Sequence, residues 1–225
     1  MSGPRVVAID GPSASGKSTT ARQVAAALGL VHLNSGLLYR AITWVALRDA
    51  WRTDHDFAAG LASLELSLDP RPPDFVLRID GAPTGASLDA AELTSRVSAV
   101  AARPDVRQLV LELIHGAVAD MGVVIDGRDI GTAVFPDATL KVFLTASPNE
   151  RARRRLAERP REVDAAAVSE EIARLGERDR LDATRQVAPL VRAGDAVDLD
   201  TTSLSPKEVV ARIVALYEQK VSPPG

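Results

Sequence analysis

The feature that most constrains the fold of this chain is a glycine-rich segment, residues 11–18, which reads Gly-Pro-Ser-Ala-Ser-Gly-Lys-Ser. It matches the pattern G-x-x-x-x-G-K-[ST]. The apolar run Val6–Ile9 precedes it, and a helical pattern follows from Lys17 to Leu28, where Gly29 ends it. A strand, a glycine-rich loop and a helix in this order form a P-loop, in which backbone N–H groups and the helix N-terminus bind the phosphates of a nucleotide.

This loop predicts a site for ATP and Mg²⁺. Lys17 is expected to reach the β- and γ-phosphates, and Ser18 to place its hydroxyl on Mg²⁺. Asp126 follows the apolar run Val123–Ile125, so it is a second candidate for Mg²⁺, directly or through water, although a cap or turn carboxylate is an equal alternative. The predicted ATP-binding residues are Gly11, Pro12, Ser13, Ala14, Ser15, Gly16, Lys17, Ser18 and Thr19.

The rest of the chain alternates short apolar runs with amphipathic helical patterns. Further strands are predicted at 30–33, 123–125, 140–144 and 196–199, which favours an α/β P-loop NTPase fold with a five-stranded parallel sheet and helices on both faces. The segment 61–86 alternates Leu with polar residues and predicts a small antiparallel sheet inside an insertion. The predicted core comprises 1–34, 117–150 and 184–225, with the insertion at 35–116 and an arginine-rich lid at 151–183.

Composition excludes several other classes of protein. The net charge is −3 and aromatic residues make up 4%, which disfavours a nucleic-acid-binding module. The chain has no cysteine, so a disulfide scaffold, a thiolate metal site and a cysteine nucleophile are excluded. No apolar run approaches the ~18 residues of a membrane span, and no signal peptide is evident, so we expect a cytoplasmic protein.

A surplus of arginines distinguishes this chain from a simple nucleotide switch. Arg40 and Arg128 lie just beyond predicted strands, where ligands bind in open α/β sheets. Phosphoryl transfer between two phosphates brings several negative charges together, and arginine forks neutralise such charges well. A further cluster lies between 151 and 161, for which a solvated helix face is the alternative interpretation.

Four segments, in order along the chain, resemble bacterial cytidylate kinases: 11–18, 34–40 (Asn-Ser-Gly-Leu-Leu-Tyr-Arg), 126–136 (Asp-Gly-Arg-Asp-Ile-Gly-Thr-Ala-Val-Phe-Pro) and 185–190 (Arg-Gln-Val-Ala-Pro-Leu). This resemblance implies phosphorylation of CMP and dCMP, and poorly of UMP, by ATP with Mg²⁺. It also implies that the insertion binds the nucleoside monophosphate. We expect ATP and CMP or dCMP as partners, no nucleic acid, no membrane, and a monomer.

The resemblance also implies individual roles. The residues it assigns to CMP are Ser35, Tyr39, Arg40, Ser98, Arg107, Arg128, Asp129, Arg178, Asp182 and Arg185. The residues expected to act in catalysis are Lys17, Arg128, Arg151, Arg154 and Arg185. The chemistry agrees for Asp129, because a carboxylate accepts the N4 amino group of cytosine and repels the carbonyl of uracil. His32, His55 and His115 are scattered along the chain and predict no catalytic histidine.

The chain departs from the family's usual pattern at Leu88-Asp89-Ala90, at Ile114-His115 and at Arg159-Pro160-Arg161 in the lid. Two alternatives to a cytidylate kinase stay open at this point. One is a P-loop kinase for another small acceptor, such as UMP or a non-nucleotide. The other is a non-catalytic nucleotide-binding regulator, which would need no second cluster of phosphate-binding arginines.

Overall fold

Five parallel strands form the centre of the fold. They are β1 (Val6–Asp10), β2 (Val31–Asn34), β6 (Val123–Asp126), β7 (Leu140–Thr145) and β8 (Val197–Asp200). They lie in the order β2-β6-β1-β7-β8. The computed structural model describes residues 5–84, 88, 91–119, 121–158 and 163–221. The predicted five-stranded parallel sheet is confirmed, with each strand within one or two residues of its expected position.

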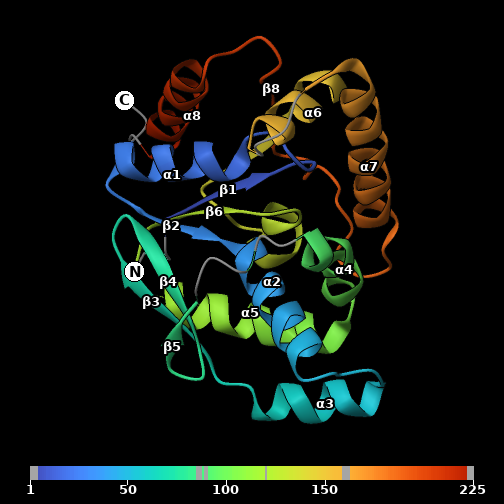
Figure 1. Cartoon of the computed structure of the whole chain (residues 1–225). Coiled ribbons are helices and arrows are strands. Elements are labelled where there is room, and N and C mark those ends of the chain that lie inside the picture. The colour runs from blue at the N-terminus through green and yellow to red at the C-terminus, as the bar shows by residue number, and fades with distance from the viewer. Residues whose placement is uncertain (1–4, 85–87, 89–90, 120, 159–162, 222–225) are drawn as a thin grey trace.

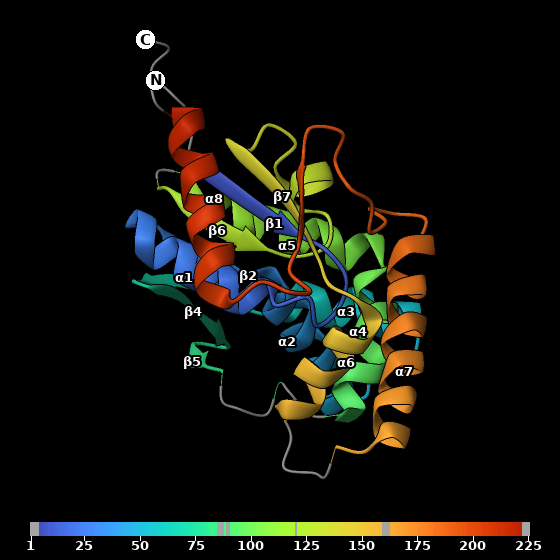
Figure 2. The same cartoon turned by 90° about the horizontal axis from the view of Figure 1, so that it is seen from above.

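Helices cover both faces of this sheet (Figure 1). Their bounds are α1 (Lys17–Leu28), α2 (Ser35–Arg48), α3 (Asp54–Ser63), α4 (Ala91–Ala101), α5 (Pro104–Val118), α6 (Pro148–Ala157), α7 (Ala165–Thr184) and α8 (Pro206–Val221). Helices α1 and α8 pack on one face and α2 and α5 on the other, while α6 and α7 stand together at the end of the sheet where the P-loop lies (Figures 1 and 2).

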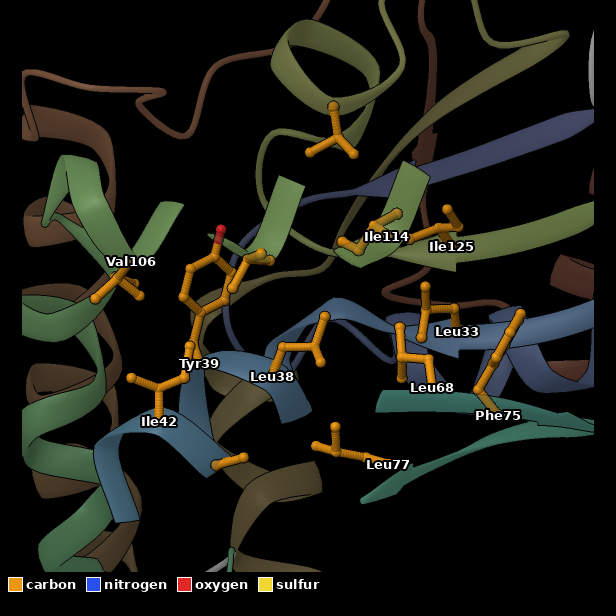
Figure 3. Close-up of a cluster of buried hydrophobic side chains, with 14 of the residues drawn as sticks. Leu33, Leu38, Tyr39, Ile42, Leu68, Phe75, Leu77, Val106, Ile114 and Ile125 are labelled. Carbon is orange, nitrogen blue, oxygen red and sulfur yellow. The ribbon is translucent and has the colours of Figure 1, made fainter. Parts of the chain in front are cut away.

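The sheet separates two hydrophobic clusters. In β1, Val7 and Ile9 face α1 and α8, whereas Val6 and Ala8 face α2 and α5. Such a strand is apolar throughout because side chains on both faces are buried. Figure 3 shows the cluster on the face covered by α2 and α5, in which Leu38 of α2 points toward Leu33 of β2 and Leu68 of β3. Ile42 lies on the side of Val106 of α5.

The predicted antiparallel sheet is present, but it is not separate. Strand β3 (Leu66–Arg71) pairs antiparallel with β4 (Asp74–Ile79), and β4 with the short β5 (Ala82–Pro83). Strand β4 also pairs parallel with β2 at a single position, His32 with Asp74. The result is one eight-stranded mixed sheet that begins β3-β4-β2. The sequence analysis did not predict this junction with β2, because a pairing between distant segments leaves no local sequence signal.

Helix α3 has no counterpart among the expected helices. None of its residues is buried, so it lacks a strong apolar stripe. Its start is nevertheless encoded by a capping box, in which the Thr53 hydroxyl accepts from the Asp56 N–H and the Asp56 carboxylate accepts from the Thr53 N–H. Within the described part of the chain, no helix combines the length and apolar character needed to cross a membrane.

Candidate functional site

A cleft of about 330 Å³ opens at the carboxyl ends of β1, β2 and β6. Its walls are the P-loop, the start of α2, the loop after β6, and α7. The predicted residues that line it are Ser13, Ala14, Gly16, Lys17, Ser18, Thr19, Ser35, Tyr39, Arg40, Ser98, Asp126, Arg128, Asp129, Arg178, Asp182 and Arg185. The predicted residues that do not line it are Gly11, Pro12, Ser15, Arg107, Arg151 and Arg154.

Two glycines give the P-loop its shape. At Gly11, φ is +146°, and a Cβ there would lie 2.1 Å from the carbonyl oxygen of Leu144. Gly16 is the N-cap of α1 with a φ of +92°, and no described side chain caps the helix. The first N–H groups of α1 therefore have no partner within the helix and are available to an anion at the cleft.

The Lys17 ammonium is buried within the P-loop. Its Nζ donates to the Pro12 carbonyl oxygen at 2.6 Å and to the Ser15 hydroxyl at 3.3 Å. Burial, and after it the charge of Arg128, lowers the Lys17 pKa well below its ordinary value. A polyphosphate in the cleft would reverse this effect, because it supplies the negative charge that this buried ammonium lacks.

Ser18 and Asp126 supply hard oxygen atoms at the base of the cleft. The Ser18 hydroxyl donates to Asp126 Oδ2 at 2.6 Å, and Asn34 Nδ2 donates to the same hydroxyl at 3.2 Å. The described residues contain no group of three His, Cys, Asp or Glu able to hold a metal by themselves. Mg²⁺ is commonly bound by one or two protein oxygens plus substrate phosphates, so this pair fits Mg²⁺ carried by a nucleotide.

The other half of the cleft is held by arginine–carboxylate pairs. Arg128 Nε donates to Asp182 Oδ2 at 3.0 Å, and Arg128 Nη2 to the Ser13 hydroxyl at 3.0 Å. The Ser98 hydroxyl donates to Asp182 Oδ1 at 3.2 Å. These contacts join the P-loop, α4, α7 and the loop after β6. Ser98 and Asp182 lie 84 residues apart in the sequence, and Ser13 and Arg128 lie 115 residues apart.

Asp129 lies between two guanidinium groups. Arg185 Nη2 donates to its Oδ1 at 2.9 Å, and Arg107 Nη2 donates to its Oδ2. Arg107 therefore acts on the cleft through Asp129, without lining it. The Asp129 side chain is only 6% exposed. Because an ionised carboxylate can accept about four hydrogen bonds, it retains the capacity to accept from a ligand.

Arg178 brings a further positive charge to the cleft. Its buried Nε has no hydrogen-bond partner among the described residues. Burial, followed by repulsion from Arg128, lowers the Arg178 pKa to about 10. Arg128 and Arg178 share the single carboxylate of Asp182, so this part of the cleft keeps a net positive charge that suits a phosphate group.

Two of the arginines predicted to act in catalysis lie outside the cleft. Arg151 Nη1 donates to the Ser13 carbonyl oxygen at 3.0 Å and pairs with Asp179, and Arg154 Nη1 donates to the Ser15 carbonyl oxygen at 3.3 Å. In this structure both arginines therefore hold the outer side of the P-loop backbone. A neighbour that was not predicted, Arg155, lines the cleft instead.

Three of the residues that depart from the family pattern, Leu88, Ile114 and His115, are described by the structure, and only Leu88 forms a hydrogen bond with a predicted site residue. Leu88 is buried and its carbonyl oxygen accepts from Arg40 Nη1 at 2.9 Å. Ile114 is fully buried, and His115 Nε2 lies 2.8 Å from the Val134 carbonyl oxygen. Asp89, Ala90 and the segment 159–161 fall outside the described residues.

The loop that carries Arg128 and Asp129 is fixed by a carboxylate that the sequence analysis did not select. Asp10, at the end of β1, accepts from the N–H groups of Ile130 at 2.9 Å and Gly131 at 2.7 Å. These residues begin the π-helical turn η2 (Ile130–Val134). An acidic residue at a buried strand end is the same signal that pointed to Asp126, and it was available in the sequence.

Asp10 makes the stability of the protein depend on pH in a predictable direction. Burial raises the Asp10 pKa from 3.8 to about 6, against the two backbone N–H groups, which lower it. A carboxyl group with a raised pKa favours folding below about pH 4 and loses this contribution as the pH rises to about 6.

We therefore expect the free energy of unfolding of the wild type, relative to Asp10→Asn, to fall by up to about 3 kcal/mol between about pH 4 and pH 7. The Asn side chain is neutral throughout this range, so the difference isolates the carboxyl group. Denaturant titrations of both proteins at several pH values measure it. A difference that does not change with pH would contradict the buried, ionisable role of Asp10.

Other residues of the site carry weaker sequence signals. Asp179 accepts from the Ser13 N–H at 2.8 Å and lies three residues before Asp182, on the same side of α7. Asn34 caps α2 by accepting from the Gly36 N–H at 2.9 Å. His32 is buried and contacts Asp126. Burial alone would lower the His32 pKa, but hydrogen bonds with Asp126 and Asp74 raise it.

Comparison with known proteins agrees with this geometry. The sequence profile of the family described as Cytidylate kinase matches residues 7–219. The cytidylate kinase of Streptomyces coelicolor is 44% identical over 219 residues, which cover 96% of this chain and 93% of that one. The cytidylate kinase of Desulfitobacterium hafniense is 42% identical over 217 residues, with the same coverage of both chains.

Two further similarities are less complete or more distant. The bifunctional pantoate ligase/cytidylate kinase of Nostoc is 45% identical over 224 residues, which cover 96% of this chain but 42% of that longer protein. The crystal structure of TT1252 from Thermus thermophilus superimposes with a TM-score of 0.50 at 18% identity, over 99% of this chain and 100% of that one, and shows likeness of fold alone. On the match over residues 7–219 and on the full-length relatives, the chain belongs to the cytidylate kinase family.

Proposed function

We propose that this protein transfers the γ-phosphoryl group of ATP to CMP and dCMP, giving CDP and dCDP. The observation that carries the proposal is the juxtaposition in one cleft of two anion sites. One is the P-loop with Lys17, and the other is formed by Arg178 and Arg128. Membership of the cytidylate kinase family supports the identity of the acceptor.

The donor half of the cleft would bind the polyphosphate of ATP. The backbone N–H groups at the start of α1 and the Lys17 ammonium would face the β- and γ-phosphates. Ser18 and Asp126 would hold Mg²⁺ together with phosphate oxygens. Mg²⁺ supplies positive charge that offsets the charge developing on the transferred group.

The acceptor half would bind the monophosphate. Arg40, Arg128 and Arg178 line the cleft and would receive its phosphate, with Arg185 adjacent. Asp129 would accept a hydrogen bond from the N4 amino group of cytosine. Ser98 and Asp182, which are hydrogen-bonded to each other, line the same cleft. Tyr39, whose pKa burial raises to about 12, stays protonated and would line the acceptor side as a neutral hydrogen-bonding group.

Transfer requires no covalent intermediate on the protein. A phosphate oxygen of CMP forms a bond to the γ-phosphorus while the bond from that phosphorus to the β–γ bridging oxygen breaks, and ADP leaves. The role of this chain's residues is to align the two nucleotides and to stabilise the transferring charge. We propose that Lys17, Arg128 and Arg185 provide that stabilisation. Arg151 and Arg154 would contribute to it only after breaking their hydrogen bonds with the P-loop carbonyl oxygens.

A panel of acceptors tests this function. With ATP and Mg²⁺, ADP formation is measured with CMP, dCMP, UMP and AMP side by side. We expect the highest kcat/KM with CMP and dCMP and a much lower value with UMP. ADP formation that does not depend on any acceptor would overturn the kinase assignment, and a preference for UMP or AMP would overturn the acceptor.

We propose a monomer as the active species, in which one chain supplies both the donor and the acceptor side of the cleft. Sedimentation velocity at assay concentrations measures this directly. The requirement for two nucleotides of central metabolism supports a cytoplasmic location.

A further inference from the structure

A buried histidine links the proposed metal end of the cleft to the β3–β4 hairpin. The His32 side chain is 6% exposed. Its Nε2 lies 2.8 Å from Asp126 Oδ1, and its Nδ1 lies 2.8 Å from Asp74 Oδ1. Both neighbours are carboxylate oxygens, which accept hydrogen bonds, so the ring donates in both directions.

Asp126 has its two oxygens engaged on opposite sides. Its Oδ1 faces His32 and its Oδ2 accepts from the Ser18 hydroxyl. The side chain is only 4% exposed, so these two contacts dominate its surroundings. A carboxylate can rotate about its Cβ–Cγ bond. The hydrogen bond between His32 and Oδ1 fixes this rotation, and it therefore determines which lone pairs of Oδ2 face Ser18.

Asp74 fixes the other side of the histidine ring. It begins β4, and its pairing with His32 is the single position at which the hairpin joins the parallel sheet. The backbone adds one more contact here, because the His32 N–H donates to the Pro73 carbonyl oxygen at 2.8 Å. Arg22 of α1 then donates to Asp74 Oδ1 at 3.0 Å, so Asp74 is held from both sides.

We infer that His32 is a positioning residue that holds the Asp126 carboxylate in the orientation required for the metal–nucleotide complex, and that Asp74 sets the orientation of His32. The inference rests on the proposed function only in taking Ser18 and Asp126 as the metal end of an ATP site. Partners that orient a metal ligand in this way commonly change metal affinity 10- to 100-fold when they are removed.

Two substitutions separate the two ring nitrogens. The amide nitrogen of His32→Gln reaches the position of Nε2 and keeps the bond to Asp126, whereas that of His32→Asn reaches the position of Nδ1 and keeps only the bond to Asp74. Both variants remove the ring and both leave a polar group in the same buried place. A role limited to filling this space would therefore affect them alike.

The decisive readout is metal affinity without turnover. Mn²⁺ is titrated by electron paramagnetic resonance into enzyme carrying a non-hydrolysable ATP analogue, with no CMP present. We expect His32→Asn to weaken Mn²⁺ binding about 10-fold or more and His32→Gln to stay within about 3-fold of the wild type. Equal affinities in the two variants, or wild-type affinity in His32→Asn, would overturn the inference.

A matched control comes from the same hairpin. Asp69 pairs with Arg78 Nε at 2.6 Å across β3 and β4, away from the cleft, so Asp69→Asn should leave Mn²⁺ affinity unchanged. Denaturant unfolding of every variant identifies any that fail to fold, and His32→Gln keeps the test decisive if His32→Asn is unstable. In that case His32→Gln must retain near-wild-type Mn²⁺ affinity, and its loss would overturn the inference.

The experiment also distinguishes the two claims. If the acceptor panel shows no transfer to CMP while the Asn and Gln variants differ as expected, the function is wrong and the role of His32 stands. If the panel succeeds and the variants do not differ, the role of His32 is wrong.

Discussion

Lys17→Met lowers kcat with CMP by at least about 100-fold while the protein stays folded; this is the largest effect on turnover that we expect. The methionine side chain keeps most of the buried stem and removes the ammonium. That ammonium lies beside the uncapped start of α1, where the transferring phosphate would develop charge. Steady-state kinetics with saturating ATP and CMP measure the loss.

Lys141 provides a control for the removal of a buried ammonium group elsewhere in the protein. It lies in β7, its side chain is 8% exposed, and its Nζ pairs with Asp195 at 2.8 Å. Lys141→Met should retain kcat within a few fold. Comparable losses in the two variants, or near-wild-type turnover in Lys17→Met, would contradict the phosphate-binding role of Lys17.

Asp129→Asn is expected to reduce the preference for CMP over UMP by about 1–3 kcal/mol in transition-state binding. The carboxylate can only accept hydrogen bonds, so it favours the N4 amino group of cytosine and disfavours the O4 carbonyl of uracil. An asparagine amide can present either its oxygen or its nitrogen and accommodates both bases. The ratio of kcat/KM for CMP to that for UMP, measured for both proteins, gives the change.

The arginines around Asp129 require a control in this experiment. Substitution weakens the pairs with Arg107 and Arg185, which lie on α5 and after α7, and so lowers stability as well as selectivity. Asp105→Asn breaks another arginine pair of α5, with Arg103, away from the cleft. It should leave the CMP/UMP ratio unchanged, and an unchanged ratio in Asp129→Asn would refute base recognition by this carboxylate.

Much of the fold was predictable because its signals are local. The strand before the P-loop, helix α1 with Gly29 at its C-cap, and the Ser147 cap of α6 are all encoded within a few residues. Helix α3 shows the limit of this approach. Its capping box is local, but with no buried residues it lacks the periodicity on which helix prediction chiefly relies.

The candidate site was predictable in composition more than in geometry. Sequence placed Arg128 and Asp129 at a strand end, but it could not show that Arg107 and Arg185 converge on Asp129 from two other helices' ends. Nor could it give the direction of a side chain. Arg151, Arg154 and Arg155 are equivalent as a sequence run, yet the helical rotation turns the first two toward the P-loop backbone and the third toward the cleft.

His32 escaped prediction for a related reason. Nothing next to it in the sequence distinguishes it from His55 or His115. Its surroundings arise from two strand pairings, with β6 on one side and β4 on the other, which bring Asp126 and Asp74 to either end of one ring. Contacts of that kind depend on the register of distant strands, and a single sequence does not reveal them.

The glycine at the N-cap of α1, Gly16, makes the stability of the protein depend on bound nucleotide. No described side-chain oxygen accepts a hydrogen bond from the first N–H groups of α1; compared with a serine or aspartate cap, this costs the free energy of folding only a few tenths of a kcal/mol. An oxygen from the protein there would occupy the place that a phosphate oxygen is to take. A bound phosphate thus supplies the hydrogen-bond partners that the chain does not give to the first N–H groups of α1, so the melting temperature should rise with nucleotide concentration.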